Sequence, residues 1–288
     1  MKKIYLFILG ILLLTGCSQS TEDAEVTDYD PKTTIIGIEP GSGTFASAER
    51  AVEAYNLDQE LHSGSSAVMT QLLQDAYKKK KPIVVTGWAP HWKFVDMDLK
   101  FLDDPKNIFG EESIHTYTRK GFKEDNPSAN AVLDRFHWSV DEMQEVLAEV
   151  NEGDKDIDVI AKDWLDRHPD KYAEWTEGIP KGKGETVTLA HVMWDSEYAS
   201  TYVISETLKR HGFKVRLIAV ESGPMYLALE NGDADATVCV WLPNSSAFFI
   251  KKHGDNMVDL GPNLTGARTG FVVPAYMDID SIEDLKLL

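Results

Sequence analysis

The stretch from Val84 to Trp92, VVTGWAPHW, ends an apolar run with a tryptophan and a proline. Two β-branched residues lead into Gly87 and Trp88, which is typical of a buried strand near its end. Such an end projects a large side chain into the space beyond the sheet, where a loop residue would be small and polar. A related stretch, VCVWLPN at residues 238–244, occurs later in the chain. Both the fold and the function depend on this repetition.

Aligning the chain with itself at an offset of 153 residues extends the repetition. FAS at 45–47 falls on YAS at 198–200, and WAP at 88–90 falls on WLP at 241–243. In each copy a strand precedes a helix, a Ser-Gly pair begins a second helix, and a strand ends in Trp-x-Pro. We infer an internal structural repeat. Because strands and helices alternate within it, the repeat predicts two α/β lobes with parallel or mixed sheets.

The apolar spacing places individual elements in these lobes. A capping box at Ser139 and Glu142 begins a helical insert between the two copies, and Pro169 ends its second helix. We interpret the tryptophans in or beside the insert as packing residues: Trp138, Trp164 and Trp175. The expected strands are 33–38, 82–88 and 187–193, and the expected helices include 45–55, 66–80, 139–150 and 157–164.

The first residues have the pattern of an export signal. Two lysines precede the apolar run 4–14, which is too short to span a bilayer and has the length of a signal-peptide core. It ends in Leu-Thr-Gly-Cys at 14–17, which resembles the lipobox of bacterial lipoproteins, where cleavage precedes a cysteine that carries a diacylglyceryl group. The alternative is an ordinary secretory signal in which Cys17 is incidental. With two acyl chains on Cys17, membrane anchoring would be stable.

The expected organisation has three parts: a signal peptide at 1–16, a lipidated Cys17 with a flexible acidic tether to residue 32, and a two-lobed domain at 33–288. Lobe 1 is expected at about 33–110 with the C-terminal segment, and lobe 2 at about 111–260. Removing the signal changes the formal charge from -18 to -20, which argues against nucleic-acid binding. Only Cys17 and Cys239 are present, and Cys239 has the pattern of an inert buried thiol.

Three tryptophans follow strands: Trp88, Trp194 and Trp241. Open α/β sheets bind ligands at the carboxyl ends of their strands, so these indoles can meet in a cleft between lobes. A single tryptophan is more often core, but three at equivalent strand ends favour a site. Indole faces attract a quaternary ammonium ion, each contributing about 0.5 to 2 kcal/mol. Micromolar affinity requires about 8 kcal/mol, so a second anchor is needed.

The turn Gly41-Ser42-Gly43 before a helix is the candidate for this anchor. Free backbone amides of Gly43 and Thr44 at a helix N-terminus favour an anion. An ordinary turn and cap fits the spacing equally well. A ligand with a cation at one end and a carboxylate at the other, such as glycine betaine, would satisfy both sites.

From Thr33 to Lys286 the chain resembles the OpuAC-type glycine betaine- and proline betaine-binding lipoproteins of osmoprotectant ABC transporters. The pieces that carry the resemblance are IIGIEPGSG, VVTGWAPHW, KFLDDPK, HTYTRKGF, AEWTEG, AHVMWDSEYAS, VESGPM, VWLPN and SIEDLK. It implies a two-lobed periplasmic-binding-protein fold of type II, with the ligand cleft between lobes.

The resemblance also implies the roles of individual residues. Trp88, Trp194 and Trp241 would surround the ammonium group, and the amides of Gly43 and Thr44 would bind the carboxylate. The lobes would close on the ligand and present it to a membrane permease driven by an ATPase. No cofactor or metal is implied, and the protein would sit lipid-anchored on the extracytoplasmic face of the cell membrane.

One position departs from the family. The family has a carboxylate-binding histidine five residues after the last tryptophan, where this chain has Ser246. A serine hydroxyl is shorter and neutral, so it leaves a larger pocket and reaches a carboxylate less directly. We therefore expect weaker glycine betaine binding, or a bulkier ligand such as proline betaine, carnitine or dimethylsulfoniopropionate. Choline is a further alternative, which would not need the turn.

Enzymatic function is not expected. The sequence lacks HExxH, GxSxG and P-loop motifs. Asp195 and Glu197 could form a carboxylate pair, but we interpret them as capping the following helix. For His91, we favour a structural role over ligand contact. A surface adhesion protein is the remaining alternative, but it would need exposed aromatic residues, whereas these tryptophans follow buried strands.

Overall fold

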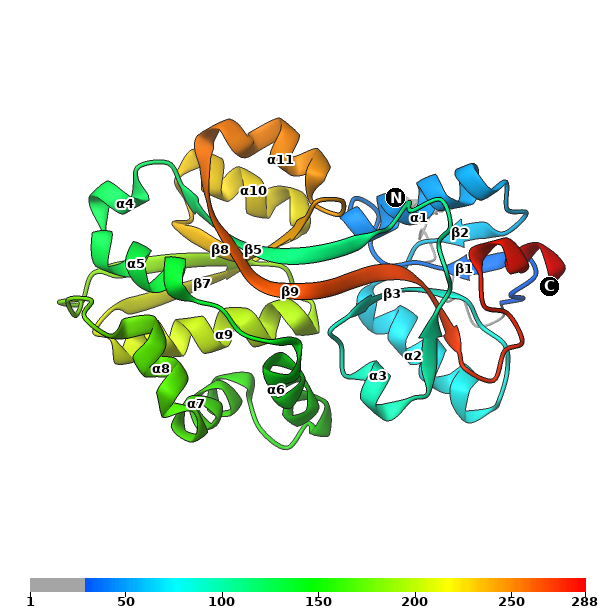
Figure 1. Ribbon diagram of the computed structural model, residues 1–288, viewed down its shortest axis with the longest axis horizontal. Coiled ribbons are helices and arrows are strands. Elements are labelled where there is room, and N and C mark those ends of the chain that lie inside the picture. The colour runs from blue at the N-terminus through cyan, green and yellow to red at the C-terminus, as the bar shows by residue number, and fades with distance from the viewer. Residues whose placement is uncertain (1–28) are drawn as a thin grey trace, which may run out of the picture.

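The computed structural model describes residues 29–288 (Figure 1). The expected signal peptide, Cys17 and most of the expected tether lie outside this part. Residues 29–32, the end of that tether, lead into the first strand, and Tyr29 packs against the main core cluster. The described part therefore includes four residues before the expected start of the two-lobed domain, and one of them contacts its core.

The two copies of the repeat fold alike, as strand, helix, strand, helix, strand. In each copy the first strand pairs in parallel with both the second and the third. The predicted repeat is thus confirmed, and the peptide bond before the proline of Trp-x-Pro is cis in both copies. The elements of the first copy are β1 (Thr34–Ile36), α1 (Gly43–Tyr55), β2 (Glu60–His62), α2 (Ser66–Lys78) and β3 (Val85–Ala89), and those of the second are β6 (Thr186–His191), α9 (Asp195–Arg210), β7 (Lys214–Ala219), α10 (Ser222–Asn231) and β8 (Ala236–Leu242).

Two long strands join the lobes, β5 (Glu111–Arg119) and β9 (Met257–Pro274). The C-terminal part of β9 runs antiparallel to β3 and to β4 (Leu99–Phe101), and its first part runs antiparallel to β5, which also pairs with β8. The strand order is β2-β1-β3-β9-β5-β8-β6-β7. Each lobe therefore has its first strand in the middle and an antiparallel strand beside its third, which is the predicted type II arrangement (Figure 1).

Helices fill the connections. The capping box of Ser139 and Glu142 begins α6, as predicted. Helix α7 ends at Arg167, but Pro169 is the first residue of α8, because proline is tolerated at a helix start. These helices are α3 (Lys93–Asp96), α4 (Phe122–Asp125), α5 (Pro127–Arg135), α6 (Val140–Glu152), α7 (Ile157–Arg167), α8 (Pro169–Thr176) and α11 (Ala247–His253), with 3₁₀ turns at Gly254–Asn256 and Ile282–Leu287.

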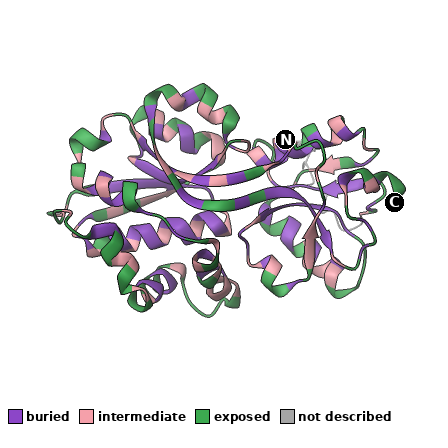
Figure 2. Cartoon of the chain, viewed as in Figure 1, coloured by how far each residue is buried: buried purple, intermediate pink, exposed green. Residues whose placement is uncertain are grey.

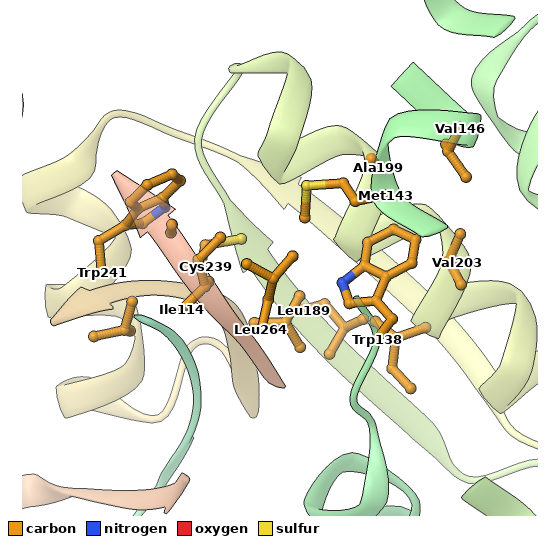
Figure 3. Packing of buried hydrophobic residues seen from close by; sticks show 14 of the residues in the cluster. Ile114, Trp138, Met143, Val146, Leu189, Ala199, Val203, Cys239, Trp241 and Leu264 are labelled. Carbon is orange, nitrogen blue, oxygen red and sulfur yellow. The ribbon is translucent and has the colours of Figure 1, made fainter. Parts of the chain in front are cut away.

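The core lies between the sheet and its covering helices (Figure 2). Trp138, Trp164 and Trp175 are buried in it, which confirms their interpretation as packing residues. The same continuous cluster contains Trp241, and Figure 3 shows Cys239 between Trp241 and Trp138. The site described below therefore rests directly on the packed interior.

Five strands were not predicted: β2, β4, β5, β7 and β9. Of these, β2 and β7 lie at the outer edges of the sheet, and all of their residues are half-buried or exposed. Edge strands of this kind lack the continuous apolar run by which a buried strand is recognised. Among residues 29–288, no helix has the length and apolarity needed to cross a membrane.

Candidate functional site

The three strand-end tryptophans line one cavity. Trp88 and Trp241 are the penultimate residues of β3 and β8, and Trp194 is the N-cap of α9 after β6. The ring centroids of Trp88 and Trp194 are 5.9 Å apart with an interplanar angle of 42°. Trp88 and Trp241 are buried, whereas Trp194 is half-buried. Because Trp88 comes from one copy of the repeat and the other two from the second, the cavity lies between the lobes.

The cavity opens to solvent, and the space in it and at its mouth that no protein atom fills is about 440 Å³. All six residues that the sequence predicted for ligand binding line it: Gly43, Thr44, Trp88, Trp194, Trp241 and Ser246. The remaining lining residues are Val192, Ser222, Met225, Tyr226, Cys239, Ser245, Phe249 and Thr269.

Carboxylates hold two of the indoles. Trp241 Nε1 donates to Glu197 Oε1 at 2.7 Å, and Trp194 Nε1 donates to Glu39 Oε2 at 3.3 Å. Such an acceptor at the N–H edge increases the electron density of the ring, which strengthens its attraction for a cation. Glu197 is buried, and burial raises its pKa to about 7. Its charge therefore changes near neutral pH.

The capping role expected for Asp195 and Glu197 is wrong. No side chain caps the N-terminus of α9, whose N-cap is Trp194. Glu197 instead points to Trp241, and Asp195 Oδ2 accepts a hydrogen bond from Trp92 Nε1 at 2.9 Å. The spacing of carboxylates after a strand is the same for a cap and for a buried acceptor, so the sequence did not distinguish the two.

A lysine lies behind Trp88. Lys93 Nζ is 4.0 Å from the centre of the Trp88 ring, and the residue is fully buried. Within residues 29–288, Nζ has no hydrogen-bond partner. Burial lowers the pKa of Lys93 to about 7, and the nearby carboxylate of Asp195 opposes this shift. One indole of the site is therefore already in contact with an amine, and the charge of this amine changes near neutral pH.

The N-terminus of α1 supplies free amides. Ser42 caps the helix by accepting from the backbone N–H of Phe45 at 3.2 Å. For the N–H groups of Gly43 and Thr44, no acceptor lies in the described part of the chain. Both residues line the cavity, so their amides are available to an anionic group at this end of it.

Gly43 also lies directly against the loop that precedes α11. A Cβ atom on Gly43 would lie 1.8 Å from the backbone oxygen of Ser245. A buried carboxylate, Glu112, holds that loop by accepting from the backbone N–H of Ser245 at 3.0 Å and from its hydroxyl. Only glycine fits at position 43 while the lobes are this close.

Ser246 is buried and hydrogen-bonded. Its Oγ accepts from the backbone N–H of Trp241 at 3.0 Å and from the hydroxyl of Tyr226 at 2.7 Å. Tyr226 was not predicted as a site residue. It lies in α10, and no local signal in the sequence distinguishes it from a core aromatic.

His91 is structural, as favoured from the sequence. It is fully buried, its ring packs edge-on against Trp88 at 5.0 Å, and its Nδ1 accepts from the backbone N–H of Lys93. Its Nε2 lies 3.3 Å from Asp195 Oδ2, across the boundary between lobes. Burial and the neighbouring Lys93 hold the pKa of His91 well below its usual value.

Cys239 is buried, as predicted, and burial raises the pKa of its thiol well above the usual range. Its position in the cavity lining was not predicted. In the described region there is no group of three or more His, Cys, Asp or Glu side chains placed to hold a metal ion. What converges here is three indoles, two free amides and a hydroxyl pair, a combination that suits binding of a small ligand with both charges.

Comparison with known proteins gives a consistent result. Residues 19–167 and 185–287 match the family model OpuAC, the substrate-binding domain of ABC-type glycine betaine transport systems. The chain is 46% identical to the glycine betaine/carnitine transport binding protein GbuC of Listeria monocytogenes serotype 1/2a (strain 10403S) over 298 aligned positions, which cover 99% of this chain and 98% of that protein.

Two solved structures are similar over about half of the chain. Lactococcal OpuAC, closed and complexed with glycine betaine, is 39% identical with a TM-score of 0.46, covering 50% of this chain and 57% of that one. ProX from Borrelia burgdorferi, a glycine betaine, L-proline ABC transporter protein, is 33% identical with a TM-score of 0.49, covering 51% and 57%. The match thus spans little more than half the length of either solved chain.

Proposed function

The chain belongs to the OpuAC family of substrate-binding domains of ABC-type glycine betaine transport systems, and on this premise we propose that it captures a zwitterionic betaine between its lobes. The observation that carries the proposal is the convergence of three strand-end indoles and the free amides of α1 on one cavity. These two features match the two charged ends of a betaine.

In this proposal the ammonium group lies among Trp88, Trp194 and Trp241, and the carboxylate lies at the amides of Gly43 and Thr44 with Ser246 beside it. Three indoles contribute about 1.5 to 6 kcal/mol. Micromolar binding takes about 8 kcal/mol, so the remainder falls to the carboxylate contacts. Exclusion of water as the lobes close strengthens both sets of contacts.

The ligand is glycine betaine or a bulkier relative. The presence of Ser246 where the family has histidine favours a larger ligand, and the Listeria relative is named for both glycine betaine and carnitine. Proline betaine and dimethylsulfoniopropionate share the same two-charge chemistry, whereas choline would leave the amides of α1 unused. An adhesion function is not favoured, because the indoles face a cavity between lobes.

Delivery completes the proposed role. The closed protein presents its ligand to the permease and ATPase of the importer, and it catalyses no reaction itself. Lobe 1 comprises about residues 33–110 with the C-terminal segment, lobe 2 comprises about residues 111–260, and the lobes move about the joining strands β5 and β9. Cys17 carries the lipid anchor on the extracytoplasmic face. Metabolic labelling with radioactive palmitate tests this anchor, since a label that persists in Cys17→Ser would contradict it.

Calorimetric titration of the full chain in detergent tests the binding function. The ligands are glycine betaine, proline betaine, carnitine, dimethylsulfoniopropionate and choline, each with the parent and with Trp241→Ala. We expect a zwitterionic betaine to bind the parent and to lose at least tenfold in affinity in the variant, because one indole face and its buried area are removed. If none of the five ligands binds the parent, the tryptophans serve another purpose.

A further inference from the structure

A pair of buried hydroxyl groups lies at the edge of the cavity. Tyr226 Oη and Ser246 Oγ are 2.7 Å apart, the tyrosine donating, and both residues line the cavity. Tyr226 is 2% exposed and Ser246 is 5% exposed. They come from different elements, Tyr226 from α10 and Ser246 from the N-cap position of α11.

The hydrogen bonds of Ser246 determine what it can still do. A serine oxygen has two lone pairs, and here one accepts from the backbone N–H of Trp241 and the other from Tyr226. Its own hydrogen has no acceptor in residues 29–288. Toward a ligand, the hydroxyl of Ser246 can therefore act only as a hydrogen-bond donor.

We propose that Tyr226 is a specificity-determining positioning residue, which fixes the hydroxyl of Ser246 as a donor and thereby selects ligands that carry a carboxylate over ligands that are only cationic. The inference rests on the proposed function and deepens it. Tyr226 acts through Ser246, which donates to the same carboxylate as the amides of Gly43 and Thr44.

The position of Tyr226 is itself fixed. Its ring stacks on Phe249 of α11, with centroids 4.6 Å apart and an interplanar angle of 9°. Burial raises the pKa of Tyr226 far above neutrality, so its hydroxyl keeps its proton at every pH relevant to binding. The donor direction from tyrosine to serine is therefore constant.

Hydrogen bonds that link hydroxyl groups in a chain also strengthen one another. When Tyr226 donates to Ser246, it polarises the serine hydroxyl, which then donates more strongly to a negative acceptor. A hydrogen bond to a charged group contributes more than one between neutral groups. A ligand without a carboxylate gains nothing from this arrangement, and this difference defines the expected selectivity.

The test compares glycine betaine with choline on the full chain. Calorimetric titrations use the parent, Tyr226→Phe, Ser246→Ala and the double variant. Tyr117→Phe is the matched control, because it removes a buried tyrosine hydroxyl that donates to Asp259 and does not line the cavity. Thermal unfolding of each variant shows whether the fold is retained.

We expect Ser246→Ala to lower glycine betaine affinity about tenfold or more and Tyr226→Phe to lower it about three- to tenfold. The affinity of each variant for choline should stay within about twofold of that of the parent. The Tyr117→Phe control should bind both ligands within about twofold of the parent. The double variant should bind glycine betaine no more weakly than Ser246→Ala alone, because the tyrosine acts only through the serine.

Three results would overturn the inference: equal losses for both ligands in Tyr226→Phe, no loss for glycine betaine in Ser246→Ala, or additive losses in the double variant. If choline binds too weakly to titrate, the inference is tested by comparing the glycine betaine affinities of the double variant and of Ser246→Ala. If Tyr226→Phe does not fold, Ser246→Ala decides by its selectivity. A parent that binds no betaine would refute the proposed function, whereas normal betaine binding in every variant would refute the roles of Ser246 and Tyr226 and leave the three indoles and the amides of α1 as the site.

Discussion

Two buried charges of opposite sign lie beside the indoles of the cavity. The carboxylate of Glu197 accepts from Trp241, and the amine of Lys93 lies over the ring of Trp88. Burial brings both pKa values to about 7 from opposite directions. Neither residue lines the cavity, yet each changes the electrostatic potential that a bound cation experiences.

This pair predicts how affinity depends on pH. Between pH 6 and pH 8 Lys93 loses its positive charge and Glu197 gains a negative charge, so the surroundings of the cavity become more negative by up to two charges. A quaternary ammonium ion and its carboxylate do not titrate in this range. We therefore expect glycine betaine affinity to rise about tenfold from pH 6 to pH 8, measured by calorimetry.

The controls separate the two groups. Glu197→Gln and Lys93→Met should each flatten part of the pH profile, and the double variant should remove it. Asp195 and His91 face Lys93, and Cys239 faces Glu197, so these groups stay unchanged in every variant. A profile that is flat or falls with pH in the parent would contradict the electrostatic account.

Among single residues, the sequence predicted those that line the cavity better than those that hold the lining side chains in place. Trp88, Trp194 and Trp241 were identifiable because each follows an apolar strand, and Gly43 and Thr44 because a glycine turn precedes a helix. Glu197, Lys93 and Tyr226 were not identified, because their contacts depend on where neighbouring elements place the partner side chain. Trp241 and Glu197, for example, are 44 residues apart in the chain.

At the scale of elements, the N-terminus of α1 and the loop before α11 determine how far the lobes approach. A Cβ on Gly43 would collide with backbone, the oxygen of Ser245, which cannot move aside as a flexible side chain can. Glu112 holds that loop in place from β5. The fit between these two segments therefore requires glycine at position 43.

Gly43→Ala should prevent full closure. We expect its glycine betaine affinity to fall at least tenfold, with a thermal unfolding midpoint close to that of the parent, because the open protein has room for the methyl group. Gly64→Ala is the matched control, since a Cβ there would meet its nearest neighbour at an ordinary 3.7 Å. A Gly43→Ala variant that binds like the parent would show that these segments do not limit closure.

Several elements were predictable from local signals, whereas others were not predicted: β4, β5, β9, α3, α4, α5, α8 and α11. The capping box of α6 and the Trp-x-Pro ends of β3 and β8 are local signals, and each appears where the sequence predicts it. The edge strands β2 and β7 have no such signal, because half of each faces outward. These two strands can be inferred only after the first strand of each copy has been placed in the middle of its lobe.

At the scale of the whole molecule, contacts across the lobe boundary lie beside the cavity as well as in it. Asp195 of α9 accepts from Trp92 Nε1 and lies close to His91, both of which belong to the segment after β3. Trp194 and Glu39 form a second pair between the copies of the repeat. In the proposed capture mechanism, these contacts form as the lobes close.

Asp195→Ala should therefore weaken binding without changing the cavity lining. We expect glycine betaine affinity to fall about threefold to tenfold, because the closed form loses a hydrogen bond to a charged acceptor. Small-angle X-ray scattering at subsaturating ligand should show a larger radius of gyration than for the parent. Asp163→Ala, which removes an exposed ion pair with Lys155 inside one lobe, is the control.

Contacts of this kind could not be predicted from the sequence. Trp92 and Asp195 are 103 residues apart, and their proximity depends on the angle between lobes rather than on any local pattern. An affinity for Asp195→Ala equal to that of its control would mean that closure does not depend on this contact.

The central claim is that the three indoles bind a positive charge and not merely an apolar shape. The most direct measurement compares glycine betaine with 3,3-dimethylbutanoate by calorimetry on the full chain, because that molecule keeps the shape and the carboxylate but has carbon in place of the charged nitrogen. Three indole faces at about 0.5 to 2 kcal/mol each predict that it binds weaker by about tenfold to ten-thousandfold. Equal affinities would show that the cavity selects by shape alone and that the three indoles do not bind the positive charge.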